Sequence, residues 1–184
     1  MGIIKLPKQP LVDPDNRRPV DYSIGTRMLE ELKKRETEIT LRELAGDLVA
    51  DKDNGMIKLY LIYKALHYRR KNREIFERGE YLTIEVMGEK ANNVCAFARR
   101  IGNSTVLVVA PRFFAGLMQQ EDLPFGKEVW KDSFIVVPFD TPGVRYQNIF
   151  TGETLTAIIY KGATVLYLSE LIANFPVALM EKID

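Results

Sequence analysis

Two hydrophobic periods follow one another along this chain, and they meet near Gly79. From Tyr22 to Arg78, apolar residues recur with the spacing of amphipathic helices. After Gly79 the period becomes two, and turn residues separate short apolar runs, as in antiparallel strands. Because the helices precede the strands, a barrel in which the two alternate is excluded. We predict an α+β fold with a helical segment over 1–78 and an antiparallel β-sandwich over 79–184.

The first two helices have clear start signals. Four closely spaced prolines make residues 1–20 an extended arm, and the first helix begins at Tyr22. The second begins at Thr40, whose hydroxyl can cap free amides while Glu43 reaches back in a capping box.

The third helix is predicted from about Gly55 to Arg78, ended by Gly79 in the left-handed conformation. Nearly every position from Met56 to Leu66 is apolar or aromatic, so this helix needs cover on most of its circumference. We expect the N-terminal arm, self-association or a partner chain to cover the face with Ile57, Tyr60, Leu61 and Lys64.

The strand period predicts a sandwich of short, mostly antiparallel strands. Tight connections are expected at Gly102-Asn103 and Lys161-Gly162, and short helices at Phe113–Gln120 and from Ser169. The expected strands are Tyr81–Val86, Val94–Arg99, Thr105–Val109, Val129–Val137, Leu155–Tyr160, Thr164–Leu168 and Phe175–Met180.

Composition excludes several classes of protein. The 26 basic and 25 acidic residues give a formal charge of +1, so no overall field draws the chain to nucleic acid or to an anionic membrane. A single cysteine and a single histidine exclude an internal disulfide and a Cys/His zinc cluster. No apolar run approaches the roughly 20 residues that span a bilayer, and no signal peptide is evident. We expect a cytoplasmic protein without a metal.

The run Asp13-Pro14-Asp15-Asn16-Arg17-Arg18-Pro19-Val20-Asp21 is the first candidate site. Carboxylates accept hydrogen bonds from sugar hydroxyls, and arginines donate in a fixed fork, so this loop suits a polyhydroxylated ligand. A salt-bridged surface loop is the alternative. A solvated carboxylate between arginines has a lowered pKa, the wrong direction for a general acid, so these are binding groups and not catalytic ones.

Other chemical candidates have simpler interpretations. The basic run from His67 to Arg73 suits the end of a helix better than a nucleic-acid site, and His67 has no second ligand beside it. Cys95 is expected to be a small buried hydrophobe in its strand. Trp130 is expected in the core, with sugar stacking as the alternative.

Seven segments, the first of them the run that begins at Asp13, resemble in order the maltooligosyltrehalose synthases of the α-amylase superfamily. DPDNRRPVDY at Asp13–Tyr22 resembles a segment that follows the last strand of the catalytic barrel, and IKLYLIYKALHYRR at Ile57–Arg70 resembles its last helix. Gly79-Glu80-Tyr81 resembles the turn into the C-terminal β domain. The remaining segments are AFARR at Ala96–Arg100, VAPR at Val109–Arg112, NIFTGE at Asn148–Glu153 and FPVALM at Phe175–Met180.

The resemblance implies an enzyme that turns the reducing-end linkage of a maltooligosaccharide into an α,α-1,1 linkage, through a covalent glycosyl-enzyme and without a cofactor. It also implies that Asp13 and Arg17 hold a glucose unit close to the cleaved bond. The chemistry of the same loop adds Asp15 and Arg18 as candidate substrate contacts. The catalytic carboxylates of the family lie upstream of this segment. We therefore expect the C-terminal portion of such an enzyme, inactive alone, whose exposed helix face meets the missing barrel or another copy.

A module without a catalytic parent is the competing hypothesis. It would bind carbohydrate through a face of the sandwich or through Trp130, or serve only as a structural β-sandwich. The resemblance also allows a third role, in which the β domain covers the barrel.

Overall fold

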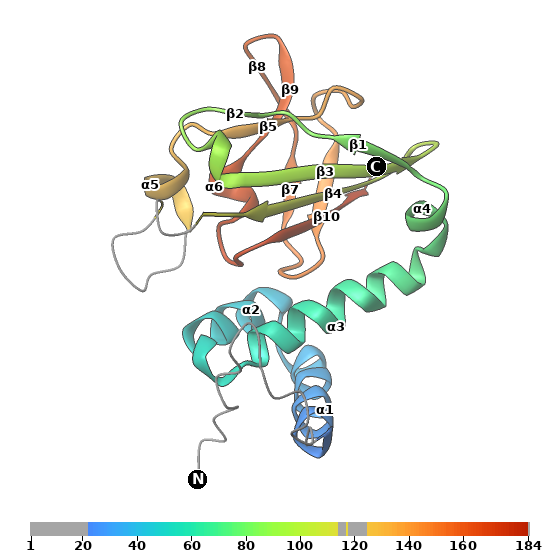
Figure 1. Cartoon of the computed structure of the whole chain (residues 1–184), viewed down its shortest axis with the longest axis vertical. Helices are drawn as coiled ribbons and strands as arrows, with labels where there is room; N and C mark the ends of the chain where they lie inside the picture. The colour runs from blue at the N-terminus through green and yellow to red at the C-terminus, as the bar shows by residue number, and fades with distance from the viewer. Residues whose placement is uncertain (1–21, 114–116, 118–124, 184) are drawn as a thin grey trace, which may run out of the picture.

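A computed structural model of the chain describes residues 22–113, 117 and 125–183. Within them a helical segment leads into antiparallel sheets, which confirms the α+β prediction (Figure 1). The helices are α1 (Tyr22–Glu38), α2 (Leu41–Ala50), the 3-10 turn η1 (Lys52–Asn54), α3 (Met56–Lys71), α4 (Arg73–Glu77), η2 (Ala91–Asn93), α5 (Gly126–Trp130) and α6 (Leu168–Leu171). The strands are β1 (Glu80–Thr83), β2 (Val86–Met87), β3 (Val94–Ile101), β4 (Ser104–Pro111), β5 (Phe134–Val136), β6 (Arg145–Asn148), β7 (Thr154–Thr156), β8 (Ile158–Tyr160), β9 (Ala163–Tyr167) and β10 (Ala178–Ile183).

Helix α2 begins as its capping sequence predicts. The Thr40 hydroxyl accepts a hydrogen bond from the Glu43 amide at 3.2 Å, and the Glu43 carboxylate accepts one from the Thr40 amide at 3.0 Å. The Thr40 hydroxyl also donates to the Glu43 carboxylate at 2.7 Å. This bond and the bond from the Thr40 amide lower the pKa of Glu43, because both favour the charged carboxylate. Leu44 and Leu48 then form the buried stripe of the helix.

The predicted third helix is interrupted, and the role predicted for its terminal glycine is wrong. α3 ends at Lys71, and Asn72 leaves the helical conformation before α4 begins. Gly79 is not in the left-handed region. It is needed for close packing instead, because a Cβ there would overlap the carbonyl oxygen of Ile75 and lie 3.1 Å from that of Arg100.

The strands form two antiparallel sheets. Sheet A has the order β1-β3-β4-β10-β6-β7, and sheet B has the order β2-β5-β9-β8. The β3–β4 hairpin turns at Gly102-Asn103 as predicted, with a positive φ of 55° at Gly102. The β8–β9 hairpin turns at Lys161-Gly162, and both residues have the positive φ that a tight two-residue turn requires.

Sheet A carries a hydrophobic core on each face. Along β10, Ala178 and Met180 pack into the core between the sheets, whereas Leu179 packs toward the helices. The same division occurs on β4, where Leu107 faces the first core and Val106 the second. The molecule therefore has three layers, with the helices on sheet A and sheet A on sheet B.

The α3 face around Tyr60, which was expected to meet the arm, a second copy or a partner chain, packs in the described residues against the outer face of sheet A. Met56 and Tyr60 are buried in the core that the helices share with sheet A, and Ile57 and Leu61 are partly buried against it. Figure 1 shows α3 passing below the sandwich. Two apolar side chains of this helix stay exposed, at 44% for Ile62 and 58% for Leu66.

Four predicted strands need correction, and a fifth strand was not predicted. The predicted strand Tyr81–Val86 is divided between β1 in sheet A and β2 in sheet B. The predicted strand Val129–Val137 is helix α5 up to Trp130 and strand only over β5. The predicted strand Leu155–Tyr160 is divided between β7 and β8. β6 was not predicted, because its sequence Arg-Tyr-Gln-Asn lacks apolar alternation. The last strand lies later than predicted, since Pro176 cannot donate a ladder hydrogen bond. The predicted helix Phe113–Gln120 lies largely outside the described residues.

No helix in the described ranges is long and apolar enough to cross a membrane.

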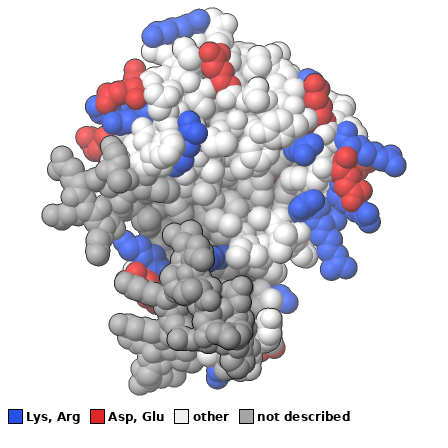
Figure 2. Space-filling model, in the orientation of Figure 1, with Lys and Arg blue, Asp and Glu red and all other residues white. Residues whose placement is uncertain are grey.

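Charges of both signs are mixed on the face in Figure 2, including the group at the right, where α3 leads into α4 (Figure 1). Arg73 pairs there with Glu77 at 2.5 Å.

Candidate functional site

The loop predicted to bind sugar, with Asp13, Asp15, Arg17 and Arg18, lies outside the described residues. The described residues offer three other candidate sites. These are the joint between the helices and the sandwich, a buried polar cluster inside the sandwich, and a hollow beside α4.

Three aromatic rings form the centre of the joint. Tyr60 of α3 donates a 2.7 Å hydrogen bond to the carbonyl oxygen of Phe150 and lies edge-on to Phe175, with ring centroids 5.9 Å apart. Phe150 and Phe175 stack on each other at 5.0 Å. Burial and the charge of Glu36 raise the pKa of the Tyr60 hydroxyl.

A turn in the segment Asn148–Glu153 presents its side chains to the helices. The Asn148 side chain accepts a bond from the Phe150 amide at 2.9 Å, and the Gly152 amide donates to the Asn148 carbonyl at 2.7 Å. Glu153 accepts two bonds from the Asn174 amide nitrogen, at 2.8 and 3.0 Å, and pairs with Arg42 of α2 at 3.4 Å. This turn therefore connects the sandwich to the helical segment.

A second contact fixes the start of the sandwich. Arg99 donates a 3.0 Å hydrogen bond to the Gly79 carbonyl, and its guanidinium lies 5.4 Å from the ring centroid of Tyr81. The Tyr81 ring stacks on Phe97 at 5.1 Å. The family-like segments at residues 79–81 and 96–100 thus bind each other, which gives them a structural role.

The buried polar cluster surrounds Asp140. Its carboxylate accepts hydrogen bonds from the Tyr146 hydroxyl and from the Lys182 ammonium, the latter at 2.6 Å. Lys182 also donates to Asn103 at 2.9 Å. The Asp140 side chain is 3% exposed, so this charge is compensated inside the protein. Burial and Asp140 raise the pKa of Tyr146.

The hollow lies between the α3–α4 break and sheet A, with a volume of about 260 Å³. Burial and a hydrogen bond with Glu181 raise the pKa of Tyr68, which lines it. The other polar side chains of its wall include Lys71, Arg73, Ser104 and Thr105. The hollow can hold a small polar molecule. The hydrogen bond between Tyr68 and Glu181, however, has a structural role, because it joins α3 to β10.

The remaining candidates have mixed outcomes. Trp130 is fully buried in the sandwich core, as predicted, although it ends a helix. The prediction for Cys95 is wrong: it is exposed, because Val94 and Ala98 take the core-facing positions of β3. His67 is exposed, with its ring 6.0 Å from that of Tyr63. The described part of the chain contains no cluster of three potential metal ligands.

No protein-family model matches the chain. Two curated proteins do match it, each named a putative maltooligosyl trehalose synthase and each from a strain of Mycobacterium tuberculosis. Both are 32% identical to it over 127 residues, which are 67% of this chain and 13% of the relative. The chain is related to the maltooligosyltrehalose synthases.

A solved maltooligosyltrehalose synthase, a variant of the enzyme from Arthrobacter ramosus, shares the fold. It matches 94% of this chain and 18% of its own length, with a TM-score of 0.60 and 24% sequence identity. This chain thus spans only a small part of the synthases that it matches. Three segments that resemble these synthases meet at the joint: those beginning at Ile57, Asn148 and Phe175. The sequence identified these segments but not their contacts, because the contacting residues are far apart in the chain. Tyr60 and Phe150, for example, are separated by 90 positions.

Proposed function

We propose that this chain is the C-terminal portion of a maltooligosyltrehalose synthase that acts in trehalose biosynthesis in the cytoplasm. The observation that carries the proposal is the 32% identity over 127 residues to proteins of that name. The shared fold over 94% of the chain supports it. In this proposal the parent enzyme transfers the reducing-end glucose of a maltooligosaccharide within the molecule, without a cofactor.

The described residues support a role in holding the parent enzyme together. The joint fixes the sandwich to α3 through Tyr60, Phe150 and Phe175, so that the two segments pack as one body. The exposed Ile62 and Leu66 are our candidates for contact with the rest of the enzyme. A second copy of this chain could cover them instead, and sedimentation distinguishes the two.

We place the chemistry in parts of the parent enzyme beyond this chain. Retaining glycoside chemistry needs a carboxylic acid with a raised pKa beside a second carboxylate. Hydrogen bonds to the charged form lower the pKa of Glu43 and of Glu89, the direction opposite to that of a general acid. In this proposal the chain alone has no turnover. Incubation with maltopentaose should leave the reducing ends intact, and their loss would contradict this.

We further propose that Asp13 and Arg17, with Asp15 and Arg18 beside them, contact a glucose unit of the substrate. The test is a chimera in which this chain replaces the matching segment of the Arthrobacter ramosus enzyme. Asp13→Ala and Arg17→Ala should lower kcat/KM in the chimera, while Glu30→Ala, an exposed residue of α1, should not. Equal activity in all three variants would exclude the loop from the substrate site.

The competing function is a non-catalytic carbohydrate-binding or structural module. Trp130 is fully buried, so it cannot stack on a sugar ring in such a module. A Trp130→Ala variant should therefore lose stability, and any glucan binding by folded protein should persist. The outer face of sheet B provides a more accessible group of aromatic side chains.

A further inference from the structure

Sheet B has apolar side chains on both of its faces. Ile135 and Leu166 point into the core between the sheets, so their neighbours in the strands lie on the opposite, outer face. Those neighbours include Phe134, Val165 and Tyr167. Phe134 and Val165 are buried, at 8% and 0% exposed, yet they belong to neither of the two main cores.

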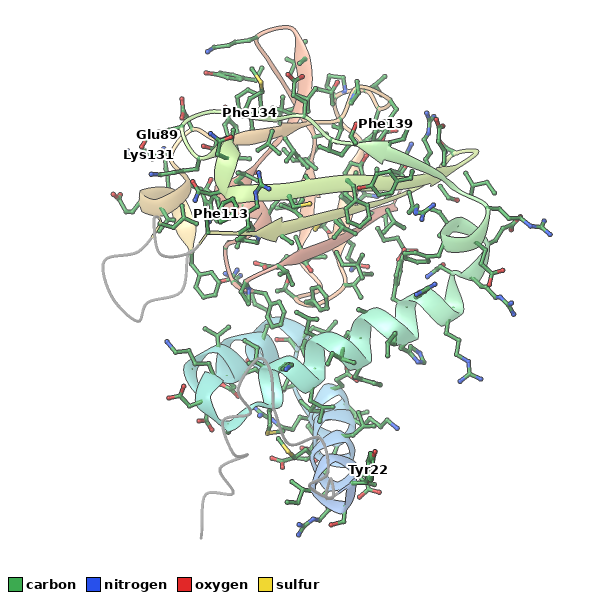
Figure 3. All side chains as sticks on the ribbon, viewed as in Figure 1. Tyr22, Glu89, Phe113, Lys131, Phe134 and Phe139 are labelled. Atoms are coloured by element: carbon green, nitrogen blue, oxygen red, sulfur yellow. The ribbon has the colours of Figure 1, made fainter. Side chains whose placement is uncertain are left out.

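Three aromatic rings meet on this outer face. Phe134 on β5, labelled in Figure 3, lies edge-on to Tyr160 and to Tyr167, with ring centroids 5.2 Å and 6.1 Å apart. The two tyrosine rings are 6.0 Å apart and tilted by 57°. Both tyrosines are partly exposed, so the rings form a floor that a ligand can reach.

Apolar and charged groups border this aromatic floor. Met87, 42% exposed, pairs with Phe134 on one side, and Ile158, 43% exposed, lies on the other edge strand. Glu85 is exposed and lies two residues before Met87, so it shares the outer face. At the opposite edge, the ammonium of Lys161 lies 5.1 Å from the ring centroid of Tyr160. A hydrogen-bond acceptor and a donor thus lie on opposite sides of the floor.

This combination matches the chemistry of a sugar chain. A glucose ring has C–H groups on its faces, which pack on aromatic rings, and hydroxyls around its edge, which bond to carboxylates and amines. Neighbouring glucose units of an α-1,4-glucan are rotated against each other, so that the chain curves. Two rings tilted by 57° suit such a curved chain better than a flat one.

We infer that the outer face of sheet B, around Tyr160 and Tyr167, is a binding surface for α-1,4-glucan chains. It is a second glucan site, separate in sequence from the loop at Asp13–Arg18. The choice of an α-glucan rests on the proposed function, whereas the presence of a sugar site rests on the aromatic floor. Such a site would hold a long substrate on the enzyme between turnovers.

The test measures the affinity of the full chain for maltoheptaose by calorimetry, with cellohexaose, a β-1,4-linked chain, as the comparison. Maltoheptaose should bind, and cellohexaose should bind at least about tenfold more weakly, a difference of about 1.4 kcal/mol. Absence of maltoheptaose binding at millimolar concentrations, or equal affinity for the two glucans, would overturn the inference.

Variants locate the binding. Tyr160→Ala and Tyr167→Ala should each weaken maltoheptaose binding by about tenfold or more, because each removes a central aromatic contact. Tyr160→Phe keeps the ring and should retain most of the affinity, so it tests the site if an alanine variant fails to fold. Tyr81→Ala is the matched control, since Tyr81 is another exposed tyrosine, at 53%, on sheet A. Equal losses in Tyr81→Ala and Tyr160→Ala would place the binding elsewhere.

Self-association is the competing occupant of this face. β8 is an edge strand, and Ile158 on its outer face is 43% exposed, which favours pairing between copies. A dimer in sedimentation that Tyr160→Ala dissociates would assign the face to a second copy and overturn the glucan site. These tests need no turnover, so a failure of the proposed catalytic role and a failure of this site give different results.

Discussion

The Tyr60 hydroxyl donates a buried 2.7 Å hydrogen bond to the Phe150 carbonyl, across 90 positions of the sequence. It joins the helical segment to the sandwich at the centre of their shared core. Tyr60→Phe keeps the ring and leaves that carbonyl without its donor, so it should lower the free energy of unfolding by about 1–3 kcal/mol. Urea denaturation measures this. An unchanged value would show that the bond does not stabilise the joint.

The Asp140 cluster should stabilise the sandwich through its pairing. Asp140→Ala leaves the Lys182 ammonium buried without its carboxylate, which should cost about 3–5 kcal/mol. The control is Glu89→Ala, which removes the exposed pair with Lys131 labelled in Figure 3 and should leave the unfolding free energy nearly unchanged. Similar losses in both variants would contradict the structural role of the buried cluster.

Two glycines should respond to alanine in opposite directions. In Gly79→Ala the new Cβ overlaps the Ile75 carbonyl, and the strain should lower stability by about 1–3 kcal/mol. Gly46 lies in α2 with open space around it, so Gly46→Ala should raise stability by about 0.5–1 kcal/mol. Thermal unfolding of the two variants compares them, and a Gly79→Ala variant as stable as the wild type would refute the close packing at Gly79.

The cap of α2 should give the stability a dependence on pH. Bonds from Thr40 lower the pKa of Glu43 below its ordinary value of 4.5 in the folded chain. The unfolded chain therefore takes up this proton first as the pH falls. The stabilisation from Glu43 is fully present above pH 4.5 and is lost as the pH falls through the lower, folded-state pKa. The stability difference between the wild type and Glu43→Gln should thus shrink in acid, and a constant difference from pH 7 to pH 3 would contradict the assignment.

Local signals were the most predictable part of this fold. Neighbouring residues predict the capping box at Thr40, the turns at Gly102 and Lys161, and the order of helices and strands. The structure confirms each of these predictions. The exposure of Cys95 and the packing role of Gly79 depend on which strand or helix lies opposite, and a periodic pattern does not determine that.

The candidate sites were less predictable for the same reason. The family-like segments were recognised from their order alone, but the contact of Tyr60 with Phe150 exists only after folding. The aromatic floor on sheet B joins Phe134, Tyr160 and Tyr167 from three strands, so no local motif marks it. The loop at Asp13–Arg18 stays a prediction.

The most direct test of the central claim is the activity of the chimera with the Arthrobacter ramosus enzyme, measured as loss of maltopentaose reducing ends. If this chain is the C-terminal portion of such a synthase, the chimera should be active while the chain alone is inert. A folded chimera without activity, or turnover by the chain alone, would contradict the account.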